Sequence, residues 1–471
     1  MCGGNMKSQK MDQIFWGWPQ RLFRSSVTLF LVFLFVVPGV LSIQAGQSTG
    51  TQPPVLDKAL KLKIIDWICL KLDEIYVFPE VAKKMEVFIR NRFSQGEYAK
   101  ITDIKQFSRT LSQDMVSVSN DRHIAVRYSL NPSLRAKRLD EEEEKKRLEQ
   151  RILDWKLDNF KFKKIEHLEG NIGYLRFDQF ADARWGGDTA IAALQFLGYC
   201  DALIIDLRYN GGGNSNMIQL ILSYFFDEQK HINSFFIPRE NKTEQSYTSS
   251  YVRGRRLDKV DLYILTSQRT FSAAEEFTYD LKHMERATVI GETTGGGGHT
   301  VATERNDELK IEFNVPDTRA VNPVTKTNWE GKGVVPHILC PMEEAFDRAY
   351  SLALKNLYEK TESKGNKKQW LKWVWEYQQT MIDPQDVHPD ILRSYVGSFG
   401  PARVVFEEGV LSVIQPGRKN KEPLLAIDEI TFIIQGDSNI RIQFEKDTAG
   451  NVVAAYGLFF DGTKQRIAKK K

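Results

Sequence analysis

Ser272 lies at the boundary between a predicted strand and a predicted helix, where its hydroxyl could act as a nucleophile. The apolar run 262–265 is typical of a buried strand, and apolar residues at helical spacing follow Ser272. A turn from strand to helix presents a hydroxyl at the carboxyl end of the strand, and the helix N-terminus favours developing negative charge. The same spacing also fits a capping box formed by Ser272 and Glu275, so spacing alone leaves both interpretations open.

Other segments carry the groups that a serine nucleophile requires. Gly211 and Gly212 follow an apolar strand, and their exposed backbone N–H groups would suit an oxyanion hole, although a tight turn also needs glycine. Gly296 lies in a second glycine loop, which either lets a peptide backbone approach closely or is simply flexible. Glu330 offers a carboxylate in a third glycine-rich loop, and a serine needs a base that is itself usually oriented by an acid.

The elements that would position these groups alternate between strands and helices. Apolar strands are predicted at 172–177, 202–207, 262–265 and 287–290, with helices at 188–199 and 216–226 between them. Nearly continuous apolar strands alternating with helices favour an α/β layer. Catalytic groups are expected at the carboxyl ends of such strands.

Other sequence patterns precede and follow this core. Apolar stripes predict three helices at 55–76, 79–93 and 103–118, and a strand is predicted at 124–128. A charge-dense run at 137–151 predicts a solvated helix face. One tryptophan-rich helix is expected at 350–375, and short strands with turn signals from 389 to 467 predict a small antiparallel β-domain.

Composition narrows the class of protein. The 471 residues carry a net charge of +4 and no basic stripe interleaved with aromatics, so nucleic acid is not an expected partner. No CxxC or HExxH spacing occurs, so neither a metal nor another cofactor is expected. Cys69, Cys200 and Cys340 are far apart among apolar neighbours, which predicts buried free thiols rather than a disulfide framework.

The first 45 residues have the layout of a secretory signal. Basic residues precede the apolar run 27–37, and small residues follow it at Ser42, Ala45 and Gly46. The apolar run is shorter than the ~20 residues of a spanning helix, so cleavage near Ala45 is favoured over an uncleaved membrane anchor. We expect an exported, periplasmic or secreted protein with no stable membrane insertion after cleavage.

The segment 202–336 resembles the C-terminal-processing (tail-specific) serine peptidases. Four blocks match in order: LIIDLRYNGGG, TFSAAEEF, RATVIGETTGGG and NWEGKGVVP. The helical segment before His123 extends the resemblance to the branch that holds the interphotoreceptor retinoid-binding protein repeats and tricorn-like enzymes. The resemblance implies a crotonase-like, ClpP-type α/β core, with an N-terminal helical domain and a C-terminal antiparallel β-domain beside it. That last domain also resembles, more distantly, accessory β-barrels of exported bacterial hydrolases.

The resemblance also implies the catalytic roles. Gly297 occupies the position of the lysine base of tail-specific enzymes, so no Ser–Lys dyad is expected. The tricorn-like branch instead implies that His123 is the general base and Glu330 the orienting acid for Ser272. The N–H groups of Gly212 and Ala273 would hold the oxyanion. His299 is a rival base, and without the resemblance His123 is equally compatible with a satisfied histidine at a strand edge.

These observations predict an exported serine peptidase that acts on peptide or protein substrates. The alternatives are a non-catalytic binder of apolar, retinoid- or fatty-acid-like ligands and a hydrolase of something other than peptide. A histidine base predicts activity that rises through roughly pH 6–7, with a higher midpoint if Glu330 stabilises the imidazolium. No oligomeric state is predicted. The expected boundaries are a signal peptide at 1–45, a helical domain at 55–120, the peptidase core at 121–360, a helical linker at 361–387 and the β-domain at 388–471.

Overall fold

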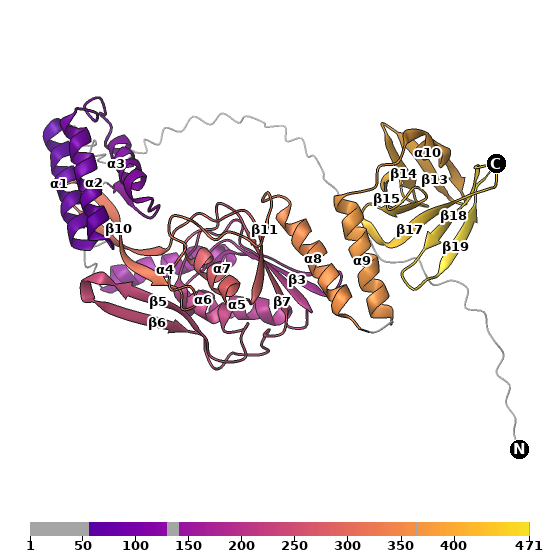
Figure 1. The fold of residues 1–471 in the computed structure, drawn as a ribbon, viewed down its shortest axis with the longest axis horizontal. Coiled ribbons are helices and arrows are strands. Elements are labelled where there is room, and N and C mark those ends of the chain that lie inside the picture. The colour runs from indigo at the N-terminus through magenta and orange to yellow at the C-terminus, as the bar shows by residue number, and fades with distance from the viewer. Residues whose placement is uncertain (1–55, 130–140, 363–364, 471) are drawn as a thin grey trace, which may run out of the picture. The chain divides into compact units, whose positions relative to one another are not determined.

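The N-terminal part of the described chain is a group of three helices. The computed structural model describes residues 56–129, 141–362 and 365–470, shown in Figure 1. The helices are α1 (Lys58–Ile75), α2 (Pro79–Ser94) and α3 (Ile104–Ser119), as the sequence predicts. Asp57 and Asp103 cap α1 and α3 by accepting backbone N–H groups, and Pro79 begins α2. The predicted signal at 1–45 lies outside the described residues.

A six-stranded sheet forms the centre of the α/β core. Its strand order is β11-β8-β7-β4-β3-β2, with all neighbours parallel except β2 and β3. The strands are β2 (Phe162–Leu168), β3 (Ile172–Phe177), β4 (Ala202–Asp206), β7 (Asp261–Thr266), β8 (Ala287–Gly291) and β11 (Ile338–Leu339). The predicted apolar strands are therefore confirmed, whereas β2, which is mostly exposed and carries an irregular apolar pattern, was not predicted.

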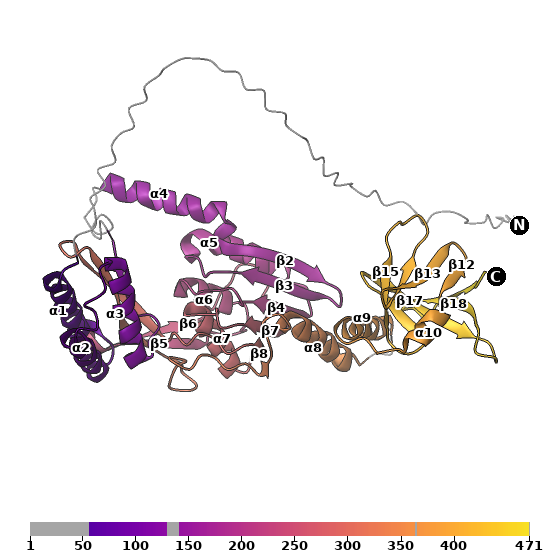
Figure 2. The same cartoon turned by 90° about the horizontal axis from the view of Figure 1, so that it is seen from above.

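Helices cover both faces of this sheet because successive strand residues point to opposite sides. The helices α5 (Ala183–Phe196), α6 (Ser215–Leu222) and α7 (Ala273–His283) pack with side chains such as Leu203 and Ile264. The helix α8 (Ala345–Lys360) packs with the alternate residues, such as Ile204 and Tyr263. The α/β interpretation is confirmed, and Figure 2 shows α5, α6 and α7 on one side of strands β3, β4 and β7 and α8 on the other.

A second sheet joins the helical region to the core. Its strands are β1 (Ala125–Tyr128), β5 (His231–Ile237), β6 (Lys242–Tyr247), β9 (His299–Asn306) and β10 (Ile311–Val321). The long strand β10 pairs with β1, β5 and β9, and its apolar residues pack against α1, α2 and α3. Only β1 was predicted. The strands β6 and β9 carry few apolar residues, whereas Ile311, Phe313 and Val315 of β10 do alternate with polar residues, a signal that the sequence prediction missed.

The C-terminal part consists of two helices and an eight-stranded antiparallel sheet. The prediction of one helix over 350–375 is wrong: α8 ends at Lys360, and α9 (Asn366–Ile382) begins after an extended Gly365. The two helices share one apolar cluster, so the tryptophan-rich stripe packs back onto α8. After the short α10 (Pro389–Ser394), strands β12 to β19 pair in sequence order between residues 397 and 468, which confirms the predicted β-domain.

Two remaining expectations, on the charge-dense run and on the cysteines, are met within the described residues. The charge-dense run forms α4 (Glu141–Leu157), whose described side chains are mostly exposed; residues 137–140 lie outside the described part. Cys69, Cys200 and Cys340 are free and buried. In the part of the chain that the structure describes, every helix is too short or too polar to cross a membrane.

Candidate active site

Ser272 occupies a strained backbone position between β7 and α7. Its φ and ψ are 55° and −121°, a conformation that residues with a side chain rarely adopt. Such strain persists only where surrounding contacts over-determine it, and it concentrates at functional sites. Ser272 also forms the predicted capping box with Glu275. The two interpretations are therefore compatible, because the cap holds the serine at the helix N-terminus.

The carboxylate of Glu275 ties Ser272 to the glycine loop after β8. Glu275 is fully buried, and one oxygen accepts from the Ser272 N–H at 2.9 Å and from the Gly297 N–H at 2.8 Å. The other oxygen accepts from the Thr294 hydroxyl at 2.5 Å and the Gly296 N–H at 2.6 Å. Burial raises the pKa of Glu275, while these donors oppose that rise. One side chain thus fixes the nucleophile and the adjacent loop together.

The predicted oxyanion donors surround Ser272 but differ in their present partners. A Cβ atom on Gly212 would lie 2.8 Å from the Ser272 Cβ, so this glycine is required for close approach. The Gly212 N–H now donates to the Asn210 side-chain oxygen at 2.9 Å. Among the described residues, the Ala273 N–H donates to none.

The other two predicted substrate-binding glycines are less favourably placed for that role. The Gly211 N–H points to the Asp178 carbonyl at 3.4 Å, and a Cβ on Gly211 would meet nothing within 4 Å. The Gly296 N–H is taken by Glu275. The N–H groups of Gly211 and Gly296 therefore already have acceptors, and neither is free to bind a substrate beside Ser272.

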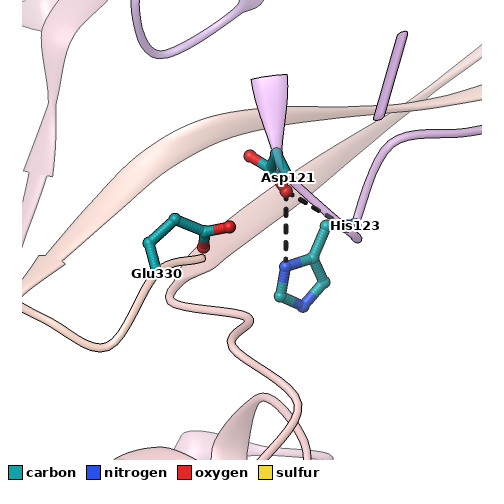
Figure 3. Close-up of side chains that lie close together, drawn as sticks. All are labelled: Asp121, His123 and Glu330. Carbon is teal, nitrogen blue, oxygen red and sulfur yellow. Dashed lines mark hydrogen bonds and ion pairs between the residues drawn. The ribbon is translucent and has the colours of Figure 1, made fainter. Parts of the chain in front are cut away.

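His123 begins the segment that leads from the helical region into β1. Its ring packs on Phe271, the residue before the nucleophile, with ring centroids 4.7 Å apart. Figure 3 shows its Nδ1 facing Asp121, whose Oδ1 is 3.8 Å away and also accepts the His123 N–H at 3.0 Å. The Nδ1 atom is sealed from solvent and has no hydrogen-bond partner. Burial lowers the pKa of His123, whereas a higher midpoint was expected if Glu330 stabilised the imidazolium.

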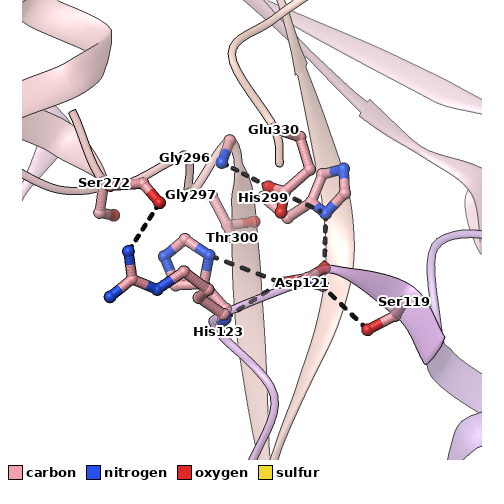
Figure 4. A network of polar contacts seen from close by, with 12 residues as sticks. Ser119, Asp121, His123, Ser272, Gly296, Gly297, His299, Thr300 and Glu330 are labelled. Carbon is pink, nitrogen blue, oxygen red and sulfur yellow. Dashed lines mark hydrogen bonds and ion pairs between the residues drawn. The ribbon is translucent and has the colours of Figure 1, made fainter. Parts of the chain in front are cut away.

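His299 and Glu330 lie on the far side of Asp121. In Figure 4 the His123 ring stands between Ser272 and Asp121, and His299 stands beside Glu330. His299 is buried, with its Nδ1 2.7 Å from the Asp121 Oδ2 and 3.4 Å from the Glu330 Oε2. Glu330 accepts the Gly298 N–H but makes no hydrogen bond to His123 among the described contacts.

The charge state of Glu330 bears on its predicted role. Burial, together with the neighbouring Asp121, raises the pKa of Glu330 to about 8. A carboxyl group with this pKa is mostly neutral at pH 7, so it is poorly suited to stabilise an imidazolium by charge. The carboxylate nearest to the free ring nitrogen of His123 is that of Asp121, which sequence reasoning placed in the histidine motif without assigning it a role.

Gly297 explains how the site accommodates a histidine. A Cβ atom there would lie 2.5 Å from the His123 Cε1 and 2.4 Å from the Phe271 Cζ. Real Cβ atoms do not approach so closely, so a side chain at this position and the observed His123 ring exclude one another. The Trp329 indole N–H donates to the Gly297 carbonyl at 2.7 Å and holds the loop in place. A lysine at position 297, where the tail-specific enzymes carry their base, would therefore clash with the His123 ring.

Three residues of the candidate site form the one group of side chains among the described residues that could hold a metal ion. Asp121, His123 and Glu330 each offer a ligand atom within 4.8 Å of the other two.

Arg122, the residue before His123, contacts the glycine loop. Its guanidinium donates to the Gly295 carbonyl at 2.9 Å and lies near the ring of Phe271. This arginine links the helical region to the glycine loop, and a sequence pattern alone gave no signal for that contact.

Comparison with known proteins identifies the family. Residues 171–340 match the model of peptidase family S41, and residues 61–154 match the N-terminal domain of this family in eukaryotic IRBP. The chain therefore belongs to peptidase family S41 by its core and its helical region, and the predicted serine-type, C-terminal-processing family is confirmed. A Staphylococcus saprophyticus protein described as a CtpA-like serine protease is 24% identical over 183 residues, which is 38% of this chain and 36% of that protein.

Solved structures similar to this chain include members of the same class. A peptidase candidate from Parabacteroides merdae is 17% identical with a TM-score of 0.44, and the match covers 66% of this chain and 98% of that one. The photosystem II D1 C-terminal processing protease is 14% identical with a TM-score of 0.37, covering 61% and 93%. The tricorn protease is 13% identical with a TM-score of 0.43, covering 65% and 38%.

Proposed function

We propose that this protein is an exported serine peptidase that cleaves peptide bonds with Ser272 as nucleophile and His123 as general base. The observation that carries the proposal is the strained Ser272 at the start of α7, with the ring of His123 packed on the neighbouring Phe271. A helix N-terminus, an unpartnered Ala273 N–H and a closely approaching Gly212 surround the hydroxyl. These are the parts that acyl transfer requires.

The proposed reaction begins when the Ser272 hydroxyl oxygen attacks the carbonyl carbon of the scissile peptide bond. His123 takes the hydroxyl proton, and the negative charge moves to the carbonyl oxygen. The Ala273 N–H donates to that oxygen, and the Gly212 N–H becomes the second donor when it leaves Asn210. His123 then gives its proton to the leaving amine as the C–N bond breaks, which leaves an acyl group on Ser272. Water attacks this acyl group while His123 takes a proton from the water, and His123 returns the proton to the Ser272 oxygen as the acid is released.

Asp121, rather than Glu330, is the carboxylate that we propose to orient His123. Its Oδ1 already accepts the backbone N–H of His123 and is the acidic oxygen nearest to Nδ1. A shift of under 1 Å would turn the 3.8 Å separation into a hydrogen bond, and catalytic hydrogen bonds are often long before substrate binds. Glu330 then acts as a neutral support for the Gly298 N–H and for His299.

The test is cleavage of a peptide library by the purified mature chain, followed by mass spectrometry of the products. We expect cleavage by wild type, and loss of cleavage in Ser272→Ala that is at least about 1000-fold, since nucleophile removal leaves only binding and oxyanion contributions. The exposed Ser94→Ala variant serves as the matched serine control and should cleave normally. Equal cleavage by Ser272→Ala and wild type would contradict the proposal.

The alternative of a non-catalytic binder of apolar ligands receives no support at Ser272. The pocket beside this serine has a volume of about 60 Å³. Sites for small molecules and cofactors typically have volumes of roughly 300–1,000 Å³. A retinoid or fatty acid therefore does not fit there in this conformation.

Export is proposed from the layout of residues 1–45. The basic region, apolar run and small residues predict a mature N-terminus near Gly46. N-terminal sequencing of the protein recovered outside the cytoplasm tests this. Recovery of the chain only from membranes, with residues 1–45 intact, would show an anchor instead.

A further inference from the structure

A small pocket opens beside the nucleophile, and its walls combine apolar and polar groups. Ser272 and Ala273 form one side, next to the position that an acyl carbon and its oxygen would occupy. Phe235, Ala320 and Trp329 supply apolar parts of the remaining wall, and Ser215, Glu276 and Thr300 supply polar parts.

Glu276 contributes a carboxyl group to this pocket. It lies four residues after Ser272 on α7, so both residues share one face of the helix. Glu276 is 7% exposed. The buried side chain of Asn233, which does not itself line the pocket, interacts with the Glu276 carboxyl by hydrogen bonding. The carboxyl of Glu276 therefore lies in the pocket wall, where it can make a further hydrogen bond to a ligand.

A carboxyl group in the wall of a small pocket favours a ligand that can hydrogen-bond to it over a ligand of the same size that cannot. Burial raises the pKa of Glu276 to about 7. Asp280 lies one turn further along α7, is buried, and has a pKa raised by burial and by Glu276. The Glu276 carboxyl accepts a hydrogen bond when ionised and can donate one when protonated, so a hydroxyl group suits it in either charge state.

The size of the pocket limits the ligand. A volume of about 60 Å³ is several times what one water molecule occupies, which leaves room for a side chain of roughly three or four non-hydrogen atoms. Lysine, arginine and aromatic side chains exceed this. Aspartate fits by size, but its charge would lie against the Glu276 carboxyl.

We propose that this pocket binds the side chain of the substrate residue on the acyl side of the scissile bond, and that Glu276 selects serine or threonine there by hydrogen bonding to the hydroxyl. This inference rests on the proposed peptidase function. Phe235, Trp329 and Ala320 would contact the methyl group of threonine, and the carboxyl of Glu276 would meet its hydroxyl. Valine has the same shape as threonine but offers the Glu276 carboxyl no hydrogen bond.

The experiment compares kcat/KM for matched peptides that differ only at this residue, with threonine, valine, serine, alanine or lysine. The enzymes are wild type, Glu276→Gln and Glu276→Leu, and melting curves check that each is folded. We expect wild type to prefer threonine to valine by roughly tenfold or more. Glu276→Gln, which keeps a hydrogen-bonding group of the same size, should retain part of this preference, and Glu276→Leu should favour valine.

A matched control lies on the same helix. Asp280→Asn changes a second buried acid that does not line the pocket, and it should keep the preference for threonine. A wild-type preference for valine or lysine, or an unchanged threonine-to-valine ratio in folded Glu276→Gln and Glu276→Leu, would overturn the inference while leaving the peptidase proposal intact. Failure of wild type to cleave any peptide would instead contradict the proposed function itself.

Discussion

The two halves of the candidate site are held in different ways. On the nucleophile side, one buried carboxylate, Glu275, accepts four hydrogen bonds and fixes both Ser272 and the glycine loop. On the base side, the Nδ1 of His123 is buried without a partner, and the nearest acid is 3.8 Å away. The first half is set by short contacts within one α/β layer, and the second depends on a segment from the helical region.

This difference indicates where the site can adjust. The strained φ of Ser272 and the complete set of bonds to Glu275 leave that half little freedom. The ring of His123 rests on Phe271 and against Gly297, and it needs only a small shift to bond to Asp121. We infer that substrate binding completes the base side and frees the Gly212 N–H from Asn210, while Ser272 itself is already in place.

The largest effect is expected when the fixed half is broken. Glu275→Gln replaces an acceptor of four donors with an amide whose NH₂ faces N–H and O–H groups. Each buried donor left without an acceptor costs about 1–3 kcal/mol, so both stability and activity should fall. We expect kcat/KM to drop by about 1000-fold and the melting temperature to decrease. The exposed Glu285→Gln on the same segment is the control; similar melting temperatures for the two variants would contradict this account.

Breaking the adjustable half should affect catalysis more than stability. Asp121→Asn removes the charge that would stabilise the imidazolium, and we expect kcat/KM to fall by about 100-fold while KM changes little. The same variant should lower the pKa of His123 further, because Asp121 favours the charged ring. A loss confined to KM would show that Asp121 serves substrate binding instead.

A methyl group added at Gly297, between Ser272 and His123, should lower kcat by a smaller factor. Gly297→Ala places a Cβ atom against His123 and Phe271, and overpacking of this kind costs about 1–3 kcal/mol. We expect roughly tenfold lower kcat, because the ring must move away from its place beside the nucleophile. Gly187→Ala, inside α5 and away from the site, is the matched control and should retain full activity. Unchanged kcat in Gly297→Ala would mean that the observed ring position is not the catalytic one.

The smallest effect is expected at Glu330. Since its pKa is raised to about 8, the neutral glutamine imitates the form that predominates at pH 7. Glu330→Gln should therefore change kcat/KM at pH 7 by only a few fold. Above pH 8 wild type should acquire a negative charge that the variant lacks, so the two profiles should separate there. A loss at pH 7 as large as that of Asp121→Asn would restore Glu330 as the orienting acid.

The sequence predicted the parallel strands, the three N-terminal helices and Ser272 at a strand-to-helix turn, because each depends on a local pattern. It did not predict β9, which carries few apolar residues, or β10, in which Ile311, Phe313 and Val315 do alternate with polar residues. This hairpin carries His299 and leads to Glu330. It also gave no role to Asp121, since contact between Asp121 and His299 joins positions 178 apart. The direction of the His123 pKa shift required burial, which no spacing reveals.

The central claim is tested most directly by the rate at which a fluorophosphonate labels Ser272 between pH 5 and 8. A histidine base is active when neutral, and burial lowers the pKa of His123, so the rate should rise with a midpoint below the ordinary value of about 6.5. His123→Ala should abolish this pH-dependent labelling, whereas His299→Ala should keep its shape. Loss of labelling in His299→Ala with normal labelling in His123→Ala would contradict the account.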